Sequence, residues 1–267
     1  MLENFTIYIP TMGRVNQQIT LDDLAMSDKL LSITKLVVRD FEFDDYDFAH
    51  SDRAEIIALP SDIEDIGQTR QWIVENCPTD YLIMLDDDLR FYKRLPESVS
   101  LRYTNGEQLE QMFVEMLDWM EFDDIPITGI SARQGNNRVE KRYSEVTRQM
   151  FAHGVDVKQF NEIGLRYDNL PLMEDFHMLL SLFTSGYKNR IFYEYCCGQP
   201  ESNAEGGCST YRTGEAQKEA AQGLEFDFPE FVTIVIKKPK TGWKGMEERH
   251  DVRIQWKKAF ASSGAEL

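Results

Sequence analysis

Hydrophobic residues in the first half of the chain fall into short runs separated by amphipathic segments. Apolar and β-branched runs predict buried strands at 5–9, 35–38, 55–59, 81–85 and 127–130. Helical spacing of apolar residues predicts helices that begin near Thr20, at 67–76 and at 104–120. Thr20 followed by Asp23, and Thr104 followed by Glu107, have the residue types of helix N-terminal caps. Strands that alternate with helices predict a Rossmann-like α/β fold with a mixed, mostly parallel sheet flanked by helices.

The pattern is less regular after residue 130. It predicts a helix at 173–185, strands at 190–195 and 231–236, and an amphipathic terminal helix at 251–260. No internal repeat and no Pro/Gly-rich linker divides the chain. We therefore expect one domain over residues 1–267, in which 131–267 completes a site opened by 1–130.

Three consecutive carboxylates end the strand predicted at 81–85. Ligands of such sheets bind beyond the carboxyl ends of the strands, which is where Asp86, Asp87 and Asp88 lie. Their mutual repulsion would be severe in a partly desolvated site, and a divalent cation would neutralise it. Alternate residues of an extended chain point the same way, so Asp86 and Asp88 can share one site. A solvated acidic turn is the alternative, but the position after an apolar strand favours the metal site.

Two further segments have features of an anion site. Pro10-Thr11-Met12-Gly13-Arg14 follows the first predicted strand, where a glycine allows a tight turn and an arginine can pair with phosphate. Gly67-Gln68-Thr69-Arg70 opens the helix before the acidic strand, and an arginine at a helix start suits a nucleotide. An ordinary strand-to-loop exit and a surface helix with an ion-paired arginine are the alternatives.

The second half contributes an acidic pair and a glycine-rich loop. Glu174 and Asp175 open the helix predicted at 173–185, either as partners of the helix dipole or as a general base for an acceptor hydroxyl. His177 is expected to be a packed or surface histidine. Gly206-Gly207, followed by hydroxyl residues and Arg212, predicts either a ligand loop or a plain surface loop.

Charge is distributed unevenly along the chain. The 267 residues carry a formal net charge of -17, which argues against a generic nucleic-acid coat protein. Eight lysines and arginines, Lys244 among them, and four acidic residues nevertheless lie between Glu230 and Phe260, and the same segment contains His250. This basic C-terminal segment predicts contacts with a phosphate backbone, a solvated charged face being the alternative. His250 is a candidate nitrogen ligand for a metal.

No segment indicates export or membrane insertion. There is no apolar run of membrane-spanning length, and the N-terminus has no basic region followed by a long apolar stretch. The four cysteines lack C-x-x-C spacing and are expected to be reduced and buried. We therefore expect a cytoplasmic protein with no membrane partner.

Taken together, the I-P-T-x-G-R segment, the arginine-bearing helix, the D-D-D strand end and the later E-D pair resemble the GT-A class of nucleotide-sugar glycosyltransferases. This resemblance implies a GT-A-like fold and a donor site with Mn²⁺ or Mg²⁺ and a nucleotide sugar, with a UDP-sugar expected. It assigns Asp86 to the ribose and Asp88 to the metal, with His250 as a second metal ligand. The remaining donor contacts would come from Pro10, Thr11, Arg14, Arg70, Asp87 and Lys244. Asp175 or Glu174 would be the catalytic base.

Four short sequence motifs also resemble those of the TET/J-associated glycosyltransferases of phages. They are M-L-D-D-D-L at 84–89, M-E-D at 173–175, G-G-C-S-T-Y-R-T at 206–213 and Q-W-K-K-A at 255–259. The resemblance implies sugar transfer to a 5-hydroxymethylpyrimidine such as hydroxymethylcytosine in phage DNA, and makes DNA the expected partner. Transfer to a glycan, lipid or small molecule, a GT-A-like nucleotidyltransferase and a non-catalytic acidic binding protein are the alternatives.

Overall fold

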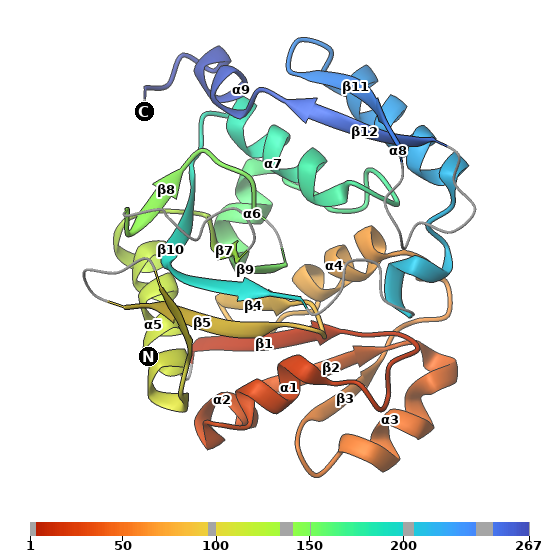
Figure 1. Cartoon of the computed structure of the whole chain (residues 1–267), viewed down its shortest axis with the longest axis vertical. Coiled ribbons are helices and arrows are strands. Elements are labelled where there is room, and N and C mark those ends of the chain that lie inside the picture. Colours follow the sequence, from red (N-terminus) through yellow and green to blue (C-terminus); the bar gives the residue numbers. More distant parts are fainter. Residues whose placement is uncertain are drawn as a thin grey trace.

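A ten-stranded sheet runs through the molecule in the order β3-β2-β1-β4-β9-β7-β10-β5-β6, with β8 paired to β10 (Figure 1). The computed structural model describes residues 4–95, 100–133, 141–149, 151–199, 206–238 and 248–266. Within them the sheet strands are β1 (Phe5–Pro10), β2 (Thr34–Val38), β3 (Glu55–Ala58), β4 (Tyr81–Leu85), β5 (Arg90–Arg94), β6 (Leu101–Tyr103), β7 (Ile127–Ala132), β8 (Tyr143–Glu145), β9 (Ala152–Asp156) and β10 (Asn189–Gly198). Of these ten strands, β5, β8 and β9 run against the direction of β1. Four of the strand pairings are parallel and five are antiparallel, so the sheet is mixed.

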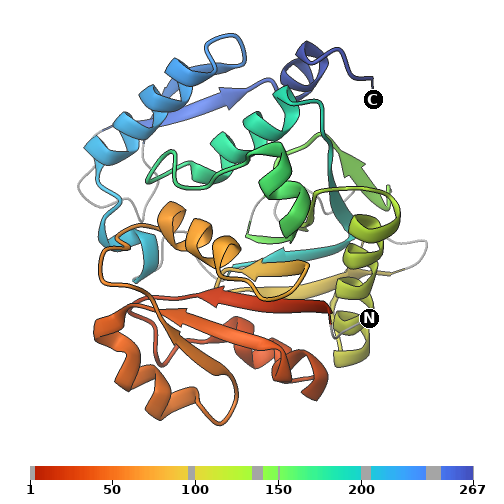
Figure 2. The same cartoon turned by 180° about the vertical axis from the view of Figure 1, so that it is seen from behind.

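Helices cover both faces of the sheet because its strands are apolar on both sides (Figures 1 and 2). One face packs against α4 (Ile66–Glu75), α6 (Val157–Ile163) and α7 (Glu174–Thr184). The other packs against α1 (Ile19–Leu24), α2 (Asp28–Ser32), α3 (Phe43–His50) and α5 (Gly106–Phe122). Successive residues of β1 serve different cores, since Tyr8 faces the first layer while Ile7 and Ile9 face the second.

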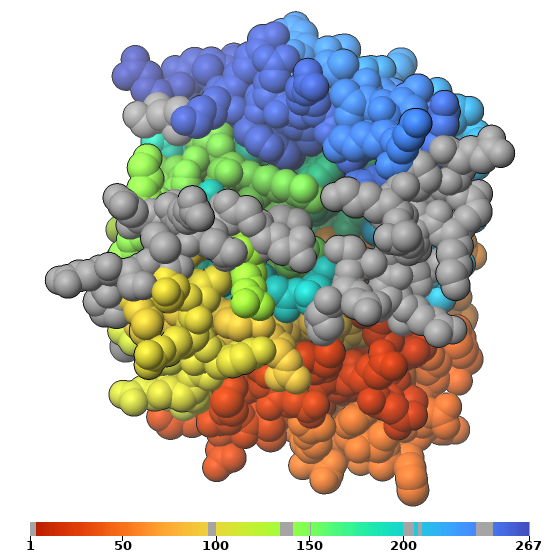
Figure 3. Space-filling model, in the orientation of Figure 1, coloured from red at the N-terminus to blue at the C-terminus, as the bar shows by residue number. Residues whose placement is uncertain are grey.

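The C-terminal segments form a further layer outside α7. They are α8 (Gly214–Asp227), the hairpin of β11 (Val232–Lys237) and β12 (Arg249–Ile254), and α9 (Trp256–Ser262). Trp256 anchors this layer, because Phe176 and Phe183 of α7 contact its ring edge-to-face. Figure 3 shows these segments, in blue, at the opposite end of the molecule from the N-terminal red and orange segments.

The strands predicted in the first half and the helices at 67–76 and 173–185 are confirmed to within a few residues. The terminal helix predicted at 251–260 is wrong in its first half, because Val252 and Ile254 alternate with polar residues in β12 and the helix begins only at Trp256. The predicted caps are also displaced. Asn105 and Gln108 form the capping box of α5, and Gln18 precedes α1, so Thr20 lies inside that helix.

Cys196 and Cys197 are buried free thiols in β10, as predicted, whereas Cys77 is a free thiol but only half-buried. No helix in the described part of the chain is both long and apolar enough to cross a bilayer.

Candidate active site

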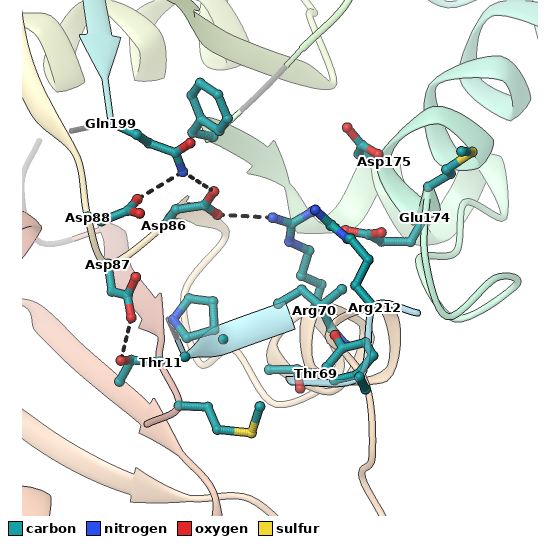
Figure 4. A pocket seen from close by; sticks show the side chains of 18 of the residues that line it. Thr11, Thr69, Arg70, Asp86, Asp87, Asp88, Glu174, Asp175, Gln199 and Arg212 are labelled. Carbon is teal, nitrogen blue, oxygen red and sulfur yellow. Dashed lines mark hydrogen bonds and ion pairs between the residues drawn. The ribbon is translucent and has the colours of Figure 1, made fainter. Parts of the chain in front are cut away.

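The carboxyl ends of β1, β4 and β10 open into a cavity of about 360 Å³. Its other walls come from the start of α4, the start of α7 and the loop before α8, which contribute Arg70, Glu174 and Arg212 (Figure 4). Residues of β12 also line it. This edge of the sheet is where an α/β fold places its ligands. The cavity brings together most of the residues singled out in the sequence: Pro10, Thr11, Arg14, Arg70, Asp86, Asp87, Asp88, Glu174, Asp175 and Arg212.

The acidic turn after β4 is fixed through its backbone. Thr20 of α1 donates its hydroxyl hydrogen to the carbonyl oxygen of Asp86 at 2.5 Å and accepts from the backbone N–H of Leu89 at 2.8 Å. The N–H of Asp86 donates to the carbonyl of Phe151, just before β9, at 3.0 Å. Thr20 therefore fixes the chain on both sides of the acidic residues rather than capping a helix.

Each of the three carboxylates is shared between one arginine and one neutral group. Arg14 Nη1 donates to Asp87 Oδ1 at 2.5 Å and to Asp88 Oδ2 at 3.2 Å, while Arg70 Nη2 donates to Asp86 Oδ1 at 3.2 Å. The Thr11 hydroxyl donates to Asp87 Oδ2 at 2.6 Å. The two remaining oxygens, Asp86 Oδ2 and Asp88 Oδ1, converge on one side-chain nitrogen, Gln199 Nε2, at 3.3 and 2.8 Å.

Burial dominates the electrostatics of these acids. Burial raises the pKa of Asp86 to about 7, Arg70 opposes that rise, and Asp88 and Asp87 add to it. Burial and the neighbouring Asp87 also raise the pKa of Asp88, against the pull of Arg14. The cavity therefore holds carboxylates that are costly to ionise together, and positive charge placed among them would be stabilising.

The loop after β1 is folded around Asp87. The N–H of Arg14 donates to the hydroxyl oxygen of Tyr46 at 3.0 Å, and the N–H of Gly207 donates to the carbonyl of Met12 at 2.8 Å. Gly13 and Gly206 have φ of +69° and +92°, and a Cβ on Gly206 would lie 2.8 Å from Arg14 Cγ. The glycine-rich segment thus packs directly on the first loop, and both line the cavity.

The start of α4, where the sequence suggested an anion site, is closed by a side chain of the protein itself. Asp65 caps the helix by accepting from the N–H of Gln68 at 2.8 Å, so an acidic side chain already occupies this terminus. A Cβ on Gly67 would lie 2.7 Å from the carbonyl oxygen of Tyr167, so glycine here permits close packing. Thr69 and Arg70, one turn further on, line the cavity.

The two acids at the start of α7 have separate environments. Glu174 is buried and accepts from Arg70 Nη1 at 2.6 Å. Burial raises its pKa to about 7, opposed by Arg70 and assisted by Asp175. The half-buried Asp175 also lines the cavity, and no residue in the described ranges hydrogen-bonds its carboxylate (Figure 4). Of the two, Asp175 has the carboxylate available to a ligand.

Of the predicted residues that the structure describes, His250 is not brought to this site. Lys244 lies outside the described residues. His250 shares a face of β12 with Val252 and Ile254, which pack against the core, whereas its neighbours Arg249 and Asp251 line the cavity. Within the described ranges, no group of three His, Cys, Asp or Glu side chains is arranged to hold a metal. The structure therefore does not place His250 with Asp88.

Other residues of the site were not predicted. Gln199 was missed because the strand predicted at 190–195 extends to Gly198, which makes Gln199 the first residue beyond a strand end. Arg148, whose guanidinium lies 4.6 Å from the centre of the Phe176 ring, and Phe151 precede a strand that was not predicted. Asp251 belongs to the segment predicted as helix, and Arg249 lies just before it, whereas both are in β12.

Known proteins resemble this chain in sequence and in fold. The model of the family described as TET-Associated Glycosyltransferase matches residues 5–207. Two curated relatives, from Enterobacteria phages T2 and T6, are both named beta-glucosyl-HMC-alpha-glucosyl-transferase. Each is 26% identical to this chain over 73% of its length and 72% of the relative's.

Solved structures extend the comparison to the fold. Staphylococcus aureus TarS 1–349 in complex with UDP-GlcNAc aligns with a TM-score of 0.55 at 13% identity, covering 83% of this chain and 66% of that one. The mannosyltransferase PcManGT of Pyrobaculum calidifontis, in complex with GDP-Man and Mn²⁺, aligns with a TM-score of 0.52 at 13% identity, over 83% of this chain and 61% of its own. These likenesses confirm the GT-A-like fold.

Proposed function

The chain belongs to the TET-associated glycosyltransferase family, and we propose that it moves a sugar from a nucleotide sugar to a 5-hydroxymethylpyrimidine in DNA. The observation that carries this proposal is the cavity itself. Carboxylates and arginines at the carboxyl ends of β1 and β4 face, across one cavity, the carboxylate of Asp175 on α7. The names of the two phage relatives support a hydroxymethylcytosine acceptor, and the ligand of the TarS structure supports a UDP-sugar donor.

A divalent cation fits the acidic turn. Among the residues that the structure describes, no arginine engages Asp86 Oδ2 or Asp88 Oδ1, and these two oxygens point at one common position. Carboxylate oxygens are the ligands that Mg²⁺ and Mn²⁺ prefer. We propose that Asp86 and Asp88 hold this ion, as the Mn²⁺ in the PcManGT structure suggests. When bound, the ion would neutralise the departing diphosphate as a Lewis acid.

The chain's own residues would do the rest of the chemistry. Pro10, Val37, Leu59 and Ile66 give the cavity an apolar wall suited to a nucleobase, and Arg14 and Arg212 lie where they can face its phosphates. Asp175 would accept the proton of the attacking hydroxyl as it displaces the diphosphate from the anomeric carbon, giving inversion. In a retaining reaction Asp175 would only position the acceptor. Glu174 is engaged with Arg70, so its role is to hold that guanidinium.

We also propose that residues 1–130 chiefly bind the donor and 131–267 the acceptor. Lys237, Arg249 and Arg253 share one face of the β11–β12 hairpin, and Arg249 reaches the cavity rim. A phosphate backbone lying on this face would bring a base close to Asp175. Lys237 and Arg249 both donate to Asp251, so the face is only partly neutralised within the protein.

The test is transfer of labelled sugar from a set of nucleotide sugars into DNA that contains hydroxymethylcytosine, hydroxymethyluracil or neither. We expect label only in hydroxymethylated DNA, release of a nucleoside diphosphate, and loss of transfer in EDTA and in Asp88→Ala. Asp175→Asn should lower kcat by about 100-fold or more while the Kd for the nucleotide stays unchanged. Released pyrophosphate would identify a nucleotidyltransferase instead. Transfer only to glycans, lipids or small molecules would remove DNA as the acceptor.

The name of the two phage relatives indicates a second possible acceptor. A beta-glucosyl-HMC-alpha-glucosyl-transferase, as named, adds its sugar to a glucose already on the base. DNA carrying glucosylated hydroxymethylcytosine should therefore be assayed beside the unglucosylated DNA. Label in the glucosylated DNA alone would assign a sugar hydroxyl as the acceptor.

A further inference from the structure

The residue that follows β10 occupies a special position beside the acidic turn. β10 pairs with β5, and Gly198 lies opposite Arg90, so the chain beyond β10 emerges next to Asp86 and Asp88. Gln199, the first residue beyond the strand, donates its amide N–H groups to Asp88 Oδ1 at 2.8 Å and to Asp86 Oδ2 at 3.3 Å (Figure 4). One amide nitrogen thus bridges two carboxylates that are separated by one residue.

The division of carboxylate oxygens shows why this bridge matters. Arginines already engage the other oxygen of each of these two carboxylates, Asp86 Oδ1 and Asp88 Oδ2. The oxygens left for a cation are therefore the two that Gln199 Nε2 contacts. In the described part of the chain, no third His, Cys, Asp or Glu is arranged with them to complete a metal site. A further protein ligand would have to be of another type.

A glutamine amide can serve as either a donor or an acceptor at one place. Its NH₂ and C=O groups are nearly the same size, and a half-turn about the Cγ–Cδ bond exchanges them. Facing two bare carboxylates, the amide presents its NH₂ group. When those carboxylates hold a hard cation, the amide can turn its oxygen toward the ion. Amide oxygens are among the usual ligands of such ions. We infer that Gln199 is the third protein ligand of the metal, and that its NH₂ group holds the two carboxylates together in the metal's absence.

This inference rests on the proposed metal-dependent function. It gives Gln199 the place among the metal ligands that was expected for His250. It also explains how two like-charged acids, the half-buried Asp86 and the buried Asp88, converge without a metal. A purely structural Gln199 would bridge the carboxylates but would not contact the ion. Metal binding by the protein itself separates these roles, without the acceptor and without catalysis.

The first experiment measures Mn²⁺ binding by the full chain in the presence of UDP, by electron paramagnetic resonance of the free ion. We expect Gln199→Leu to weaken Mn²⁺ binding by about tenfold or more. Gln111→Leu is the matched control, because Gln111 lies on the exposed part of α5 and donates only to Glu115. Wild-type affinity in a folded Gln199→Leu protein would overturn the assignment.

A second variant tests the ligand directly and does not depend on how Gln199→Leu folds. Histidine at position 199 would exchange an oxygen ligand for a nitrogen, and imidazole favours Co²⁺ over Mn²⁺ more strongly than an amide oxygen does. We expect Gln199→His to raise the affinity ratio of Co²⁺ to Mn²⁺ by about tenfold and to shift the visible spectrum of the Co²⁺-loaded protein, whereas Gln111→His changes neither. An unchanged spectrum would overturn the assignment.

The two proposals fail differently. Absence of sugar transfer to any hydroxymethylated DNA, with Mn²⁺ binding that still depends on Gln199, would overturn the proposed acceptor and keep the ligand. Metal-dependent transfer with Mn²⁺ binding indifferent to Gln199 would keep the proposed function and overturn the ligand. Wild-type protein that binds no Mn²⁺ with UDP would overturn both the ligand and the metal dependence.

Discussion

Arg70 joins two carboxylates that come from different walls of the cavity. It donates to Asp86 beyond β4 and to Glu174 at the start of α7, and its own side chain is 9% exposed. A buried ion network of this kind contributes little net stability when complete, but breaking it leaves uncompensated charge. Arg70 therefore positions two acids of the site rather than adding a large share of the folding free energy.

Replacing Arg70 should show the cost of leaving these two carboxylates without their arginine. We expect Arg70→Met to lower the free energy of unfolding by roughly 3–5 kcal/mol, because Glu174 and Asp86 are left unpaired. The double variant Arg70→Met/Glu174→Gln should recover part of the lost free energy of unfolding. We expect a coupling free energy of about 1–3 kcal/mol between the two residues, measured by urea denaturation. Arg166→Met removes a more exposed pair with Asp168 and should cost about 1 kcal/mol or less. Additive effects of the Arg70 and Glu174 changes would contradict the shared network.

Glu174 makes stability depend on pH in a defined direction. Its pKa in the folded protein, about 7, lies above the ordinary value of 4.5. Between these values the folded protein retains a proton that the unfolded chain has lost. The stability contributed by this group is therefore fully present below about pH 4.5 and is lost as the pH rises through about 7.

The difference in Tm between Glu174→Gln and wild type should therefore widen in favour of the variant as the pH rises from about 5 to about 8. Thermal melts in matched buffers measure it. Glu162→Gln, on the exposed side of α6, should show no such widening. A difference that narrows toward high pH would mean that the ion pair with Arg70 outweighs the cost of burial.

At the scale of elements, the start of α4 is set by the backbone that passes over it. A Cβ on Gly67 would lie 2.7 Å from the carbonyl oxygen of Tyr167 and 2.8 Å from that of Leu170, and neither oxygen belongs to a movable side chain. A Cβ on Gly223 of α8 would also lie 2.8 Å from Leu170, but from the end of its side chain. The two glycines therefore differ in what an added methyl group would displace.

Gly67→Ala should lower the free energy of unfolding by about 1–3 kcal/mol, because the added methyl group would push the backbone at Tyr167 and Leu170 away from α4. Gly223→Ala should be neutral or slightly stabilising, since alanine is favoured over glycine in a helix by up to about 1 kcal/mol and the leucine can move. Chemical denaturation of both variants gives the comparison. Because Arg70 lies one turn beyond Gly67, Gly67→Ala should also weaken nucleotide binding. Equal stability of the two variants would remove this explanation of the glycine.

The elements that the sequence predicted are those whose apolar pattern is unbroken. β1 and β4 are runs of mostly apolar residues, and α5 has buried apolar residues at helical spacing. β9, Ala-His-Gly-Val-Asp, was missed although all five residues are buried, because it is built from small and polar residues. A Cβ on Gly154 would lie 2.7 Å from Thr128 Oγ1, so the tight packing between β4 and β7 selects glycine over a β-branched residue.

The site residues that could be predicted are likewise those with a clear local sequence pattern. Asp86, Asp87 and Asp88 were found because they are consecutive and follow a predicted strand. Gln199 and Arg148 reach the cavity from segments that the tertiary fold brings together, and no local pattern distinguishes them. His250 was singled out for its chemistry alone, and the alternation of β12 directs it to the opposite face from Arg249 and Asp251.

At the scale of the whole molecule, the net charge of -17 and a DNA acceptor are compatible only if basic residues gather on one surface. The hairpin face of Lys237, Arg249 and Arg253 leads to the cavity rim, and the exposed Lys257 follows at the start of α9. Phosphate contacts by such residues release counterions, so raising the salt concentration should weaken DNA binding.

Arg253→Glu/Lys257→Glu should therefore weaken DNA binding and reduce the slope of log Kd against log salt by about 2, one unit for each lost phosphate contact. Lys29→Glu/Lys158→Glu changes the net charge equally but lies on α2 and α6, so its slope should match wild type. Fluorescence anisotropy with hydroxymethylated duplexes measures both. If the two pairs weaken binding equally, the overall charge governs association and the hairpin is not the docking face. If neither does, the acceptor strand approaches the cavity from another side.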